Sequence, residues 1–291
     1  MNIIVEAIIT GILTGGVYAL MSSGLTLIFG VMEIINIAIG ALVILGGYLS
    51  YVLQQYLHLD LFVGLLITMP AMFLLGLAIE WAFIRPLKRD RVMFSILVTF
   101  AIALIIEGVL SQIFGTNYVQ LHAWYVTASV DIGGFYLAYI YIFGFLLSVV
   151  LLTGLYLLLY HTKLGQSVRA SMQNRTAAAL IGIDVERVSL ITFGIGVALT
   201  AAGGMAFGAT NSFNPDSAYD LISRLLVIII LGGMGSLRGA LIASLFMLVV
   251  EDVTAVVWSP VWSSTVFFIL LVVVLLVRPQ GIFGQLEGRK Q

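Results

Sequence analysis

The sequence predicts an all-α polytopic membrane protein with about eight transmembrane helices plus one short broken or re-entrant element, and it allows a weak internal repeat. Of its 291 residues, 61% are hydrophobic and only 9% are charged, whereas a soluble domain carries about 25% charged residues. Runs such as 225–231 and 267–277 are apolar on every side, which excludes the alternating pattern of a β-barrel. The chain has no cysteine, so disulfides and thiolate metal sites are excluded.

Eight apolar stretches have the length of a transmembrane helix, about 20 residues: 3–22, 38–57, 61–84, 92–113, 137–160, 188–208, 237–257 and 261–277. The first has neither a basic leading region nor a small-residue cleavage site, so we expect a retained helix rather than a signal peptide. A ninth apolar piece at 221–231 would be only about 16 Å long as a helix. No remaining stretch can bury a core of its own, so residues 1–291 are predicted to form a single transmembrane domain.

The positions of the basic residues predict the orientation of these spans. Eleven of the 13 lysines and arginines fall in three clusters: Arg85, Lys88, Arg89 and Arg91; Lys163, Arg169, Arg175 and Arg187; Arg278, Arg289 and Lys290. By the positive-inside rule all three clusters face the cytoplasm and the N-terminus lies outside. The path from the second cluster to the third needs an even number of crossings, so the short piece at 221–231 must cross or half-cross the membrane as well.

The longest polar interruption of the chain runs from Thr162 to Ile183. Its apolar positions 172, 179, 180 and 183 recur at helical offsets, which favours one short amphipathic helix. A membrane protein can reverse direction in about five residues. We therefore expect the basic segment of about 162–187 to dock a partner protein; the alternative is a helix that lies on the lipid headgroups.

Two glycine-rich or polar breaks interrupt the apolar runs at corresponding places in the two halves. Phe29–Gly40 contains Asn36 and ends on Gly40, and Leu231–Gly239 contains Gly232, Gly233 and Gly235. A helix rich in small residues follows each break. In transporters with internal repeats, discontinuous helices of this kind line the substrate path. The alternative is that the glycines permit close helix packing.

Several classes of function have no support in the sequence. There is no phosphate-binding loop motif, and His58, His122 and His161 show no metal-ligand spacing. We therefore expect no catalytic residue, no bound metal, no cofactor and no nucleic-acid partner, and the chain is not predicted to be an enzyme. Glu107 lies deep in the fourth span, where an ionisable group suggests a proton-coupled carrier.

Three other acids have simpler explanations. Arg224 follows Asp220 at helical spacing and is expected to pair with it. Glu251 and Asp252 lie near Trp258 and Trp262, at an expected interface, where contact with solvent would account for both carboxylates.

Motifs along the whole chain resemble the permease subunits (LivH type) of branched-chain amino-acid ABC transporters. The matching stretches are Phe29–Met32, Ile35–Gly40, Gly46–Tyr48, Leu164–Ala170, Asn174 with Ala177 and Ala178, Gly182–Ile183, Gly232–Ser236, Gly239–Ala240 and Arg278–Gly284. Two positions depart from the family pattern. Ile39 stands where a histidine is usual, a departure that concerns the substrate rather than the architecture. Thr176 stands where the general coupling motif has glutamate, which is common in this branch of the family.

The resemblance implies an importer subunit that has no ATPase of its own. Such a permease pairs with a homologous permease or with itself, with two cytoplasmic ATPase subunits and with an extracytoplasmic binding protein, in the inner membrane of a bacterium. It also implies residue roles in ATPase coupling (Gly165, Arg169, Met172, Asn174, Ala178, Leu180, Gly182) and in the translocation path (Asn36, Gly40, Gly232, Gly233, Gly235). Arg169 and Asn174 would anchor the coupling segment, Met172 and Leu180 would fill the ATPase groove, and Gly182 would end the helix.

Three alternatives stay open from the sequence. The same class of subunit carries urea, short amides or sugars in other systems. A self-sufficient secondary carrier would use a proton or sodium gradient through Glu107 or Glu33. A non-transporting membrane scaffold would need neither the glycine breaks nor the basic segment.

Overall fold

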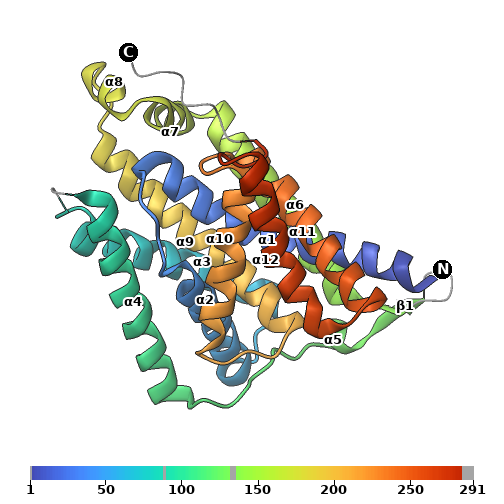
Figure 1. The fold of residues 1–291 in the computed structure, drawn as a ribbon. Coiled ribbons are helices and arrows are strands. Elements are labelled where there is room, and N and C mark those ends of the chain that lie inside the picture. Colours follow the sequence, from blue (N-terminus) through green and yellow to red (C-terminus); the bar gives the residue numbers. More distant parts are fainter. Residues whose placement is uncertain (1, 88–89, 132–135, 284–291) are drawn as a thin grey trace.

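The structure, a computed structural model, describes residues 2–87, 90–131 and 136–283 and is a bundle of helices with one small hairpin (Figure 1). The helices are α1 (Asn2–Met32), α2 (Ile39–Leu57), α3 (Leu61–Ile79) with the π-helical turn η1 (Glu80–Ile84), α4 (Arg91–Phe114), α5 (Trp124–Thr127), α6 (Tyr139–His161), α7 (Lys163–Gln173), α8 (Arg175–Leu180), α9 (Val185–Thr210), α10 (Ser217–Gly232), α11 (Leu237–Val257) and α12 (Pro260–Val277). Strands β1 (Ser129–Asp131) and β2 (Tyr136–Ala138) pair antiparallel, with Ser129 opposite Ala138.

Seven helices of the described residues are long and apolar enough to cross a membrane, and they are α1, α3 with η1, α4, α6, α9, α11 and α12. Each corresponds to one of the eight predicted spans. The eighth, 38–57, is also a helix, α2, with nearly the predicted bounds, but it is not among the seven. The all-α polytopic fold expected from the composition is therefore confirmed.

Helix α9 is the centre of the bundle, and 78% of its membrane-length stretch is buried inside the protein. Small residues allow the neighbouring helices α1 and α2 to approach its backbone. A Cβ on Gly196 would lie 2.8 Å from the carbonyl oxygen of Gly24 on α1, and a Cβ on Gly46 of α2 would lie 2.6 Å from the Cα of Ala201. Contacts of this kind hold membrane helices together in the absence of a hydrophobic driving force between them.

The first break begins later than the sequence predicts. Helix α1 continues ten residues beyond the predicted span end and stops at Met32. The chain then turns at Glu33, whose φ is 54°, and returns into the protein, where the backbone N–H of Ile37 donates to Thr99 Oγ1 on α4 at 3.1 Å. Residues 33–38 are therefore the only non-helical part of the predicted Phe29–Gly40 break.

The short apolar piece is longer than predicted. Helix α10 covers 16 residues, about 24 Å at the α-helical rise, so it crosses most of an apolar layer. Helix α10 is not among the seven helices found long and apolar enough to cross a membrane, so the even number of crossings expected from the basic clusters stays a prediction. The break after it is reduced to residues 233–236, where Gly233 and Gly235 have positive φ of 92° and 82°.

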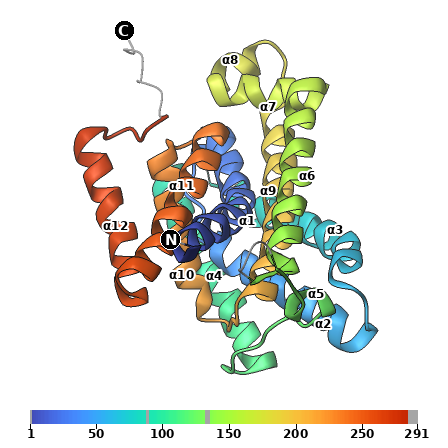
Figure 2. The ribbon, with the colours of Figure 1, turned by 90° about the vertical axis from the view of Figure 1, so that its right-hand side faces the viewer.

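Helices α7 and α8 lie at one end of the bundle, together with the C-terminal end of α12 (Figure 2), and this end carries the described residues of the three basic clusters. Arg85 pairs there with Glu186, and Arg175 donates to the carbonyl oxygen of Val31 at 3.4 Å. Lys88, Arg89, Arg289 and Lys290 fall outside the described residues. We call this the α7 end, and we call the opposite end, which carries α5, β1 and β2, the hairpin end.

The hairpin end is closed by a hydrogen-bonded loop. Asp60 caps α3 by accepting from the backbone N–H of Phe62 at 2.9 Å, and it also accepts from the hydroxyl of Tyr125 at 2.9 Å. Burial, reinforced by this hydrogen bond, raises the pKa of Tyr125 above its ordinary value. The phenol is therefore protonated at neutral pH and remains a donor.

Candidate functional site: the polar helix pair and two cavities

The polar segment folds as two helices rather than the single one predicted. Thr162 caps α7 by accepting from Gly165 N at 3.0 Å, and Asn174 ends α7 and caps α8 by accepting from Ala177 N at 2.9 Å. An asparagine at this position satisfies a free backbone donor of the new helix. Helix α8 ends as predicted around Gly182, whose φ of 89° allows Gly182 N to bond Ala179 O and Ile183 N to bond Ala178 O, both at 3.1 Å.

Part of the predicted coupling set packs against the bundle itself. Gly165 lies so close to the last turn of α6 that a Cβ there would overlap the carbonyl oxygens of Leu158 and Leu159. Ala178 is buried. The Arg169 guanidinium lies over the ring of Tyr160, 4.6 Å from its centroid, a cation–π arrangement. The contacts of Gly165 and Arg169 fix the position of α7 on α6.

Two other members of the set have different surroundings. The terminal methyl of the half-buried Met172 lies against Gly30 at the end of α1, so Met172 contacts its own chain. Leu180 is 83% exposed and the neighbouring Ile181 is 76% exposed. This apolar tip of α8 is available to a partner.

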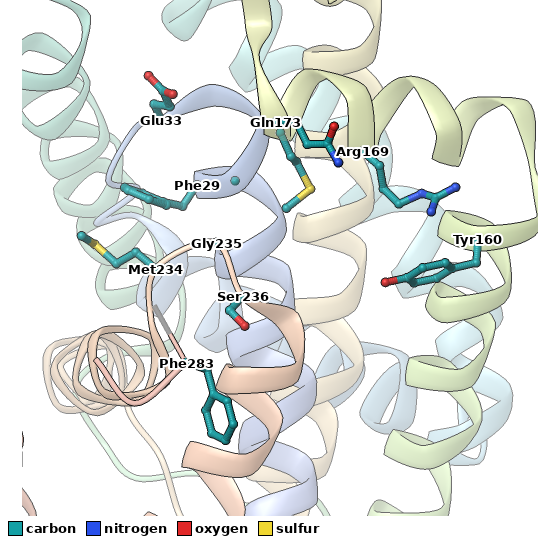
Figure 3. A pocket seen from close by; sticks show the side chains of 11 residues that line it. Phe29, Glu33, Tyr160, Arg169, Gln173, Met234, Gly235, Ser236 and Phe283 are labelled. Carbon is teal, nitrogen blue, oxygen red and sulfur yellow. The ribbon is translucent and has the colours of Figure 1, made fainter. Parts of the chain in front are cut away.

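A cavity of about 680 Å³ opens at the α7 end, and we call it the α7-end cavity (Figure 3). Its walls come from the end of α1, the end of α6, α7, and the break between α10 and α11. The lining residues are Phe29, Gly30, Glu33, Tyr160, Arg169, Met172, Gln173, Met234, Gly235, Ser236 and Phe283. The structure thus brings Arg169 and Met172 of the predicted coupling set together with Gly235 of the predicted path.

The remaining residues predicted for the path lie in close packing. A Cβ on Gly40 would overlap the carbonyl oxygen of Ala218 on α10, and Gly232 and Gly239 are in mutual backbone contact. Gly233 forms the turn after α10. Asn36 is fully buried; its Oδ1 accepts from Ala38 N at 3.0 Å, and its Nδ2 has no partner among the described residues.

A second cavity, of about 570 Å³, lies at the hairpin end, and the sequence did not predict it. We call it the hairpin-end cavity. Its lining residues are Thr10, Thr14, Tyr18, Tyr118, Tyr141, Phe207, Asn211, Ser212, Asn214, Asp216, Ser217, Asp220, Arg224, Leu248, Glu251 and Asp252. The spacing of four between Thr10, Thr14 and Tyr18 is a polar stripe on α1 that could have indicated it.

The hairpin-end cavity contains a buried ion pair. Arg224 on α10 pairs with Asp220 at 2.9 Å, as predicted, and it pairs with Glu251 on α11 as well. Its Nη2 donates to Ser264 Oγ on α12 at 3.3 Å. Glu251 is only 8% exposed, so the expectation that it contacts solvent is wrong. Arg224 therefore ties three helices together beside the cavity.

The two cavities lie at opposite ends of the same helices. Tyr18 and Phe29 are the nearest α1 residues of the two cavities, and about 16 Å of helix separates them. Leu25 on α1, Ile228 on α10 and Met247 on α11 are fully buried in one continuous apolar core within this interval. The polar spaces are therefore separated by an apolar barrier.

Neither the acids nor the histidines of the described residues form a metal site, since no group of three ligand-type side chains lies close enough. Glu107 is half-buried on α4 and lies near the hydroxyl of Tyr219 on α10. This contact gives the carboxylate a structural partner at the hairpin end of the bundle.

Comparison with known proteins agrees with the resemblance drawn from the motifs. A sequence model of the family described as branched-chain amino acid transport system / permease component matches residues 7–275. The high-affinity branched-chain amino acid transport system permease protein LivH of Salmonella typhimurium is 27% identical over 98% of this chain and 97% of its own length.

Two further relatives extend the comparison. The probable branched-chain amino acid transport permease protein LivH of Methanocaldococcus jannaschii is 29% identical over 94% of this chain and 90% of its own. The fructose import permease protein FruG of Bifidobacterium longum is 23% identical over 48% of this chain and 44% of its own. No solved structure matches the chain. The family model covers most of the polytopic helical bundle, and the chain belongs to the family of branched-chain amino acid transport system permease components.

Proposed function

We propose that this chain forms the translocation path of an ATP-binding-cassette importer for branched-chain amino acids. The observation that carries the proposal is the pair of polar cavities at opposite ends of α1, α6, α10 and α11, separated by an apolar barrier. Alternating access requires such an arrangement, because each cavity must be reachable from one side of the membrane only.

The proposed substrate comes from the names of the relatives. Two nearly full-length relatives are branched-chain amino acid permeases, while the fructose permease matches about half of the chain. The apolar barrier also suits a ligand with an aliphatic side chain, since it offers that side chain no polar group to desolvate. Urea, short amides and sugars remain the competitors within the superfamily.

The polar helix pair is the proposed docking element for an ATPase subunit. Its exposed apolar tip, Leu180 and Ile181, would enter a groove of the partner, and α7 would pass the movement to α1 through Met172 and Gly30. In this arrangement two ATPase subunits act on two permeases, either two copies of this chain or this chain and a homologue, and an extracytoplasmic binding protein delivers the substrate. The α7 end then faces the cytoplasm, the N-terminus lies outside, and the whole chain acts as one permease domain in the inner membrane.

Reconstitution tests this function directly. The chain is placed in liposomes with its native ATPase, second permease and binding protein, and uptake of labelled leucine is measured with ATP inside or outside. We expect uptake that depends on ATP and is inhibited by unlabelled isoleucine but not by urea or ribose. Inhibition by ribose or urea would reassign the substrate, and leucine uptake by the chain alone without ATP would refute the importer.

Docking has a sharper test. Leu180→Asp should abolish co-purification of the ATPase while the chain still inserts in the membrane, because a charge cannot enter an apolar groove. The matched control is Gln166→Asp on the exposed face of α7, which should leave the complex intact. Leu276→Asp is not a suitable control, because Leu276 lies on a membrane span. Retention of the ATPase by Leu180→Asp would contradict the assignment of α8.

A further inference from the structure

We propose that the hairpin-end cavity binds the ammonium group of a small primary amine through Glu251 and Asp252. This inference rests on the proposed function for the identity of the natural ligand, which would be the amino-acid substrate. The cavity volume of about 570 Å³ is within the usual range for small-molecule sites, about 300–1,000 Å³.

The charges around the cavity favour a cation. Four carboxylates line it, from Asp216, Asp220, Glu251 and Asp252, and among its described lining residues Arg224 supplies the single positive charge. The cavity therefore has a formal excess of three negative charges. A cavity walled by protein focuses such a field and raises the local concentration of a cationic ligand.

The positive charge of Arg224 already interacts with groups of the protein. Its guanidinium donates to Asp220, to Glu251 and to the hydroxyl of Ser264. Each of the three nitrogens therefore has a partner within the protein, and two of these partners are carboxylates that balance the charge of the guanidinium, although two of its five N–H donors take part in none of these bonds. Arg224 holds the site together and does not select for an anion.

Two carboxylate oxygens at the same place lack a hydrogen-bond donor. Glu251 is 8% exposed, and only its Oε1 meets Arg224. Its Oε2 and the Oδ2 of the adjacent Asp252 are buried and have no partner among the described residues. A buried carboxylate oxygen without a donor is costly, so these two atoms call for a ligand with several donors.

An ammonium group meets this requirement better than a bare metal ion. It carries three donors and no acceptor, so one group can serve both unpartnered oxygens and a neighbouring hydroxyl. The described acids and histidines do not form a metal-binding group of three. Phe207 and Leu248 in the same wall offer an apolar surface to an aliphatic side chain attached to that ammonium.

The absence of cysteine from the chain allows a direct test. Thr14→Cys places one thiol in the cavity, and Ser129→Cys places one on the exposed hairpin at the same end, outside the cavity lining. The purified complex in lipid nanodiscs is treated with a small water-soluble thiol reagent, and the rate of thiol modification is measured in the presence of three ligands. These are leucine, leucinamide, which keeps the ammonium but not the carboxylate of leucine, and 4-methylpentanoate, which keeps the carboxylate but not the ammonium.

We expect leucinamide and leucine to slow modification of Thr14→Cys, 4-methylpentanoate to have no effect, and Ser129→Cys to react equally in all conditions. Adding Asp252→Asn should raise the leucinamide concentration needed for half protection by about tenfold or more, because one charge-assisted hydrogen bond is lost. Asp252→Glu should keep the protection. If Asp252→Asn does not fold, Glu251→Gln supplies the same comparison, with elution as a single species as the folding criterion.

Protection by 4-methylpentanoate, protection by sodium chloride alone, or no protection by any amine would each overturn the proposal. The outcome is separable from that of the importer assay. Protection by leucinamide in a protein that does not import leucine would keep the ammonium site and refute the proposed transport function. ATP-driven leucine uptake without protection would keep the transport function and refute the ammonium site.

Discussion

Met172 on α7 closes against Gly30 on α1: its terminal methyl lies in the space that a Cβ on Gly30 would need. This contact joins the polar helix pair to α1, one of the helices that border both cavities. Any movement of α7 toward the bundle must therefore displace the end of α1 or force Met172 out of its place.

The fit between these two residues can be tested by over-packing. Gly30→Val should leave insertion unchanged and lower ATP-driven uptake by about tenfold, since over-packing costs about 1–3 kcal/mol. Adding Met172→Ala should restore much of the uptake, because it removes the side chain that the valine would strike. Losses that simply add in the double variant would show that the two residues are not coupled.

The backbone contact between Gly232 and Gly239 makes a prediction about stability. Gly239→Ala should lower the thermal unfolding midpoint in detergent, because its methyl would overlap the Gly232 carbonyl oxygen and neither backbone can yield easily. The matched control is Gly108→Ala on α4, where no atom lies within 4 Å of the new Cβ; its helix propensity should raise stability by up to about 1 kcal/mol. Equal midpoints for the two variants would contradict the packing.

The ion pair of Arg224 and Glu251 predicts a non-additive pair of substitutions. Their side chains are 16% and 11% exposed, so Arg224→Met should destabilise the protein by about 3–5 kcal/mol by leaving a buried charge without a partner. The double variant with Glu251→Leu should recover most of that loss. Unfolding by heat, followed by tryptophan fluorescence, measures all three proteins.

An exposed ion pair serves as the control for this comparison. Arg187 pairs with Asp184 with side chains 83% and 51% exposed, so Arg187→Met should give no measurable change in the unfolding midpoint. A double variant as unstable as Arg224→Met alone would mean that the arginine stabilises the bundle through contacts other than the carboxylate.

The orientation of the chain has a labelling test. Gln166 on α7 and Ser129 on β1 are both exposed and lie at opposite ends of the bundle. With a thiol reagent that cannot enter cells, Ser129→Cys should react in intact cells and Gln166→Cys only after the membrane is opened. Reaction of Gln166→Cys in intact cells would place α7 on the outside, and the importer proposal would fail with it.

Substitution of Glu107 separates the importer from an ion-coupled carrier. Glu107→Gln should leave ATP-driven uptake nearly unchanged, since a glutamine of the same shape keeps an oxygen acceptor beside the Tyr219 hydroxyl. The assay is run with and without an agent that dissipates the proton gradient. Loss of uptake in the variant, together with sensitivity to the gradient, would favour the carrier.

The bilayer explains which parts of the fold the sequence predicts well. Because every backbone group in the apolar layer must be satisfied within its own segment, a long apolar run has to be a helix, and the predicted span 237–257 coincides with α11. The predicted end of the first span at residue 22 is too early. Ser23 and Thr26 each donate to a carbonyl oxygen of their own helix, at 2.7 Å, so α1 continues through polar residues at which hydropathy alone would stop it.

The functional features depend on contacts that no local pattern contains. The helix boundary at Asn174 is a capping event, and periodicity averaged over 162–183 does not resolve it. The partner of Arg224 lies 27 residues away, on the next helix, so the sequence shows the nearby Asp220 and leaves Glu251 to be explained as a solvent-exposed acid. The roles of glycines are equally hard to predict from local sequence. Gly40 packs against a backbone and Gly235 lines a cavity, but both stand in glycine-containing breaks between apolar runs.

Helix α1 has a mechanical consequence that follows from its length. It runs unbroken for 31 residues, about 46 Å, and so acts as one rigid element with one of the two cavities beside each half. A rigid helix that pivots near the contact of Gly24 with Gly196 of α9 must move its two ends in opposite directions. Such a movement would widen one cavity and narrow the other.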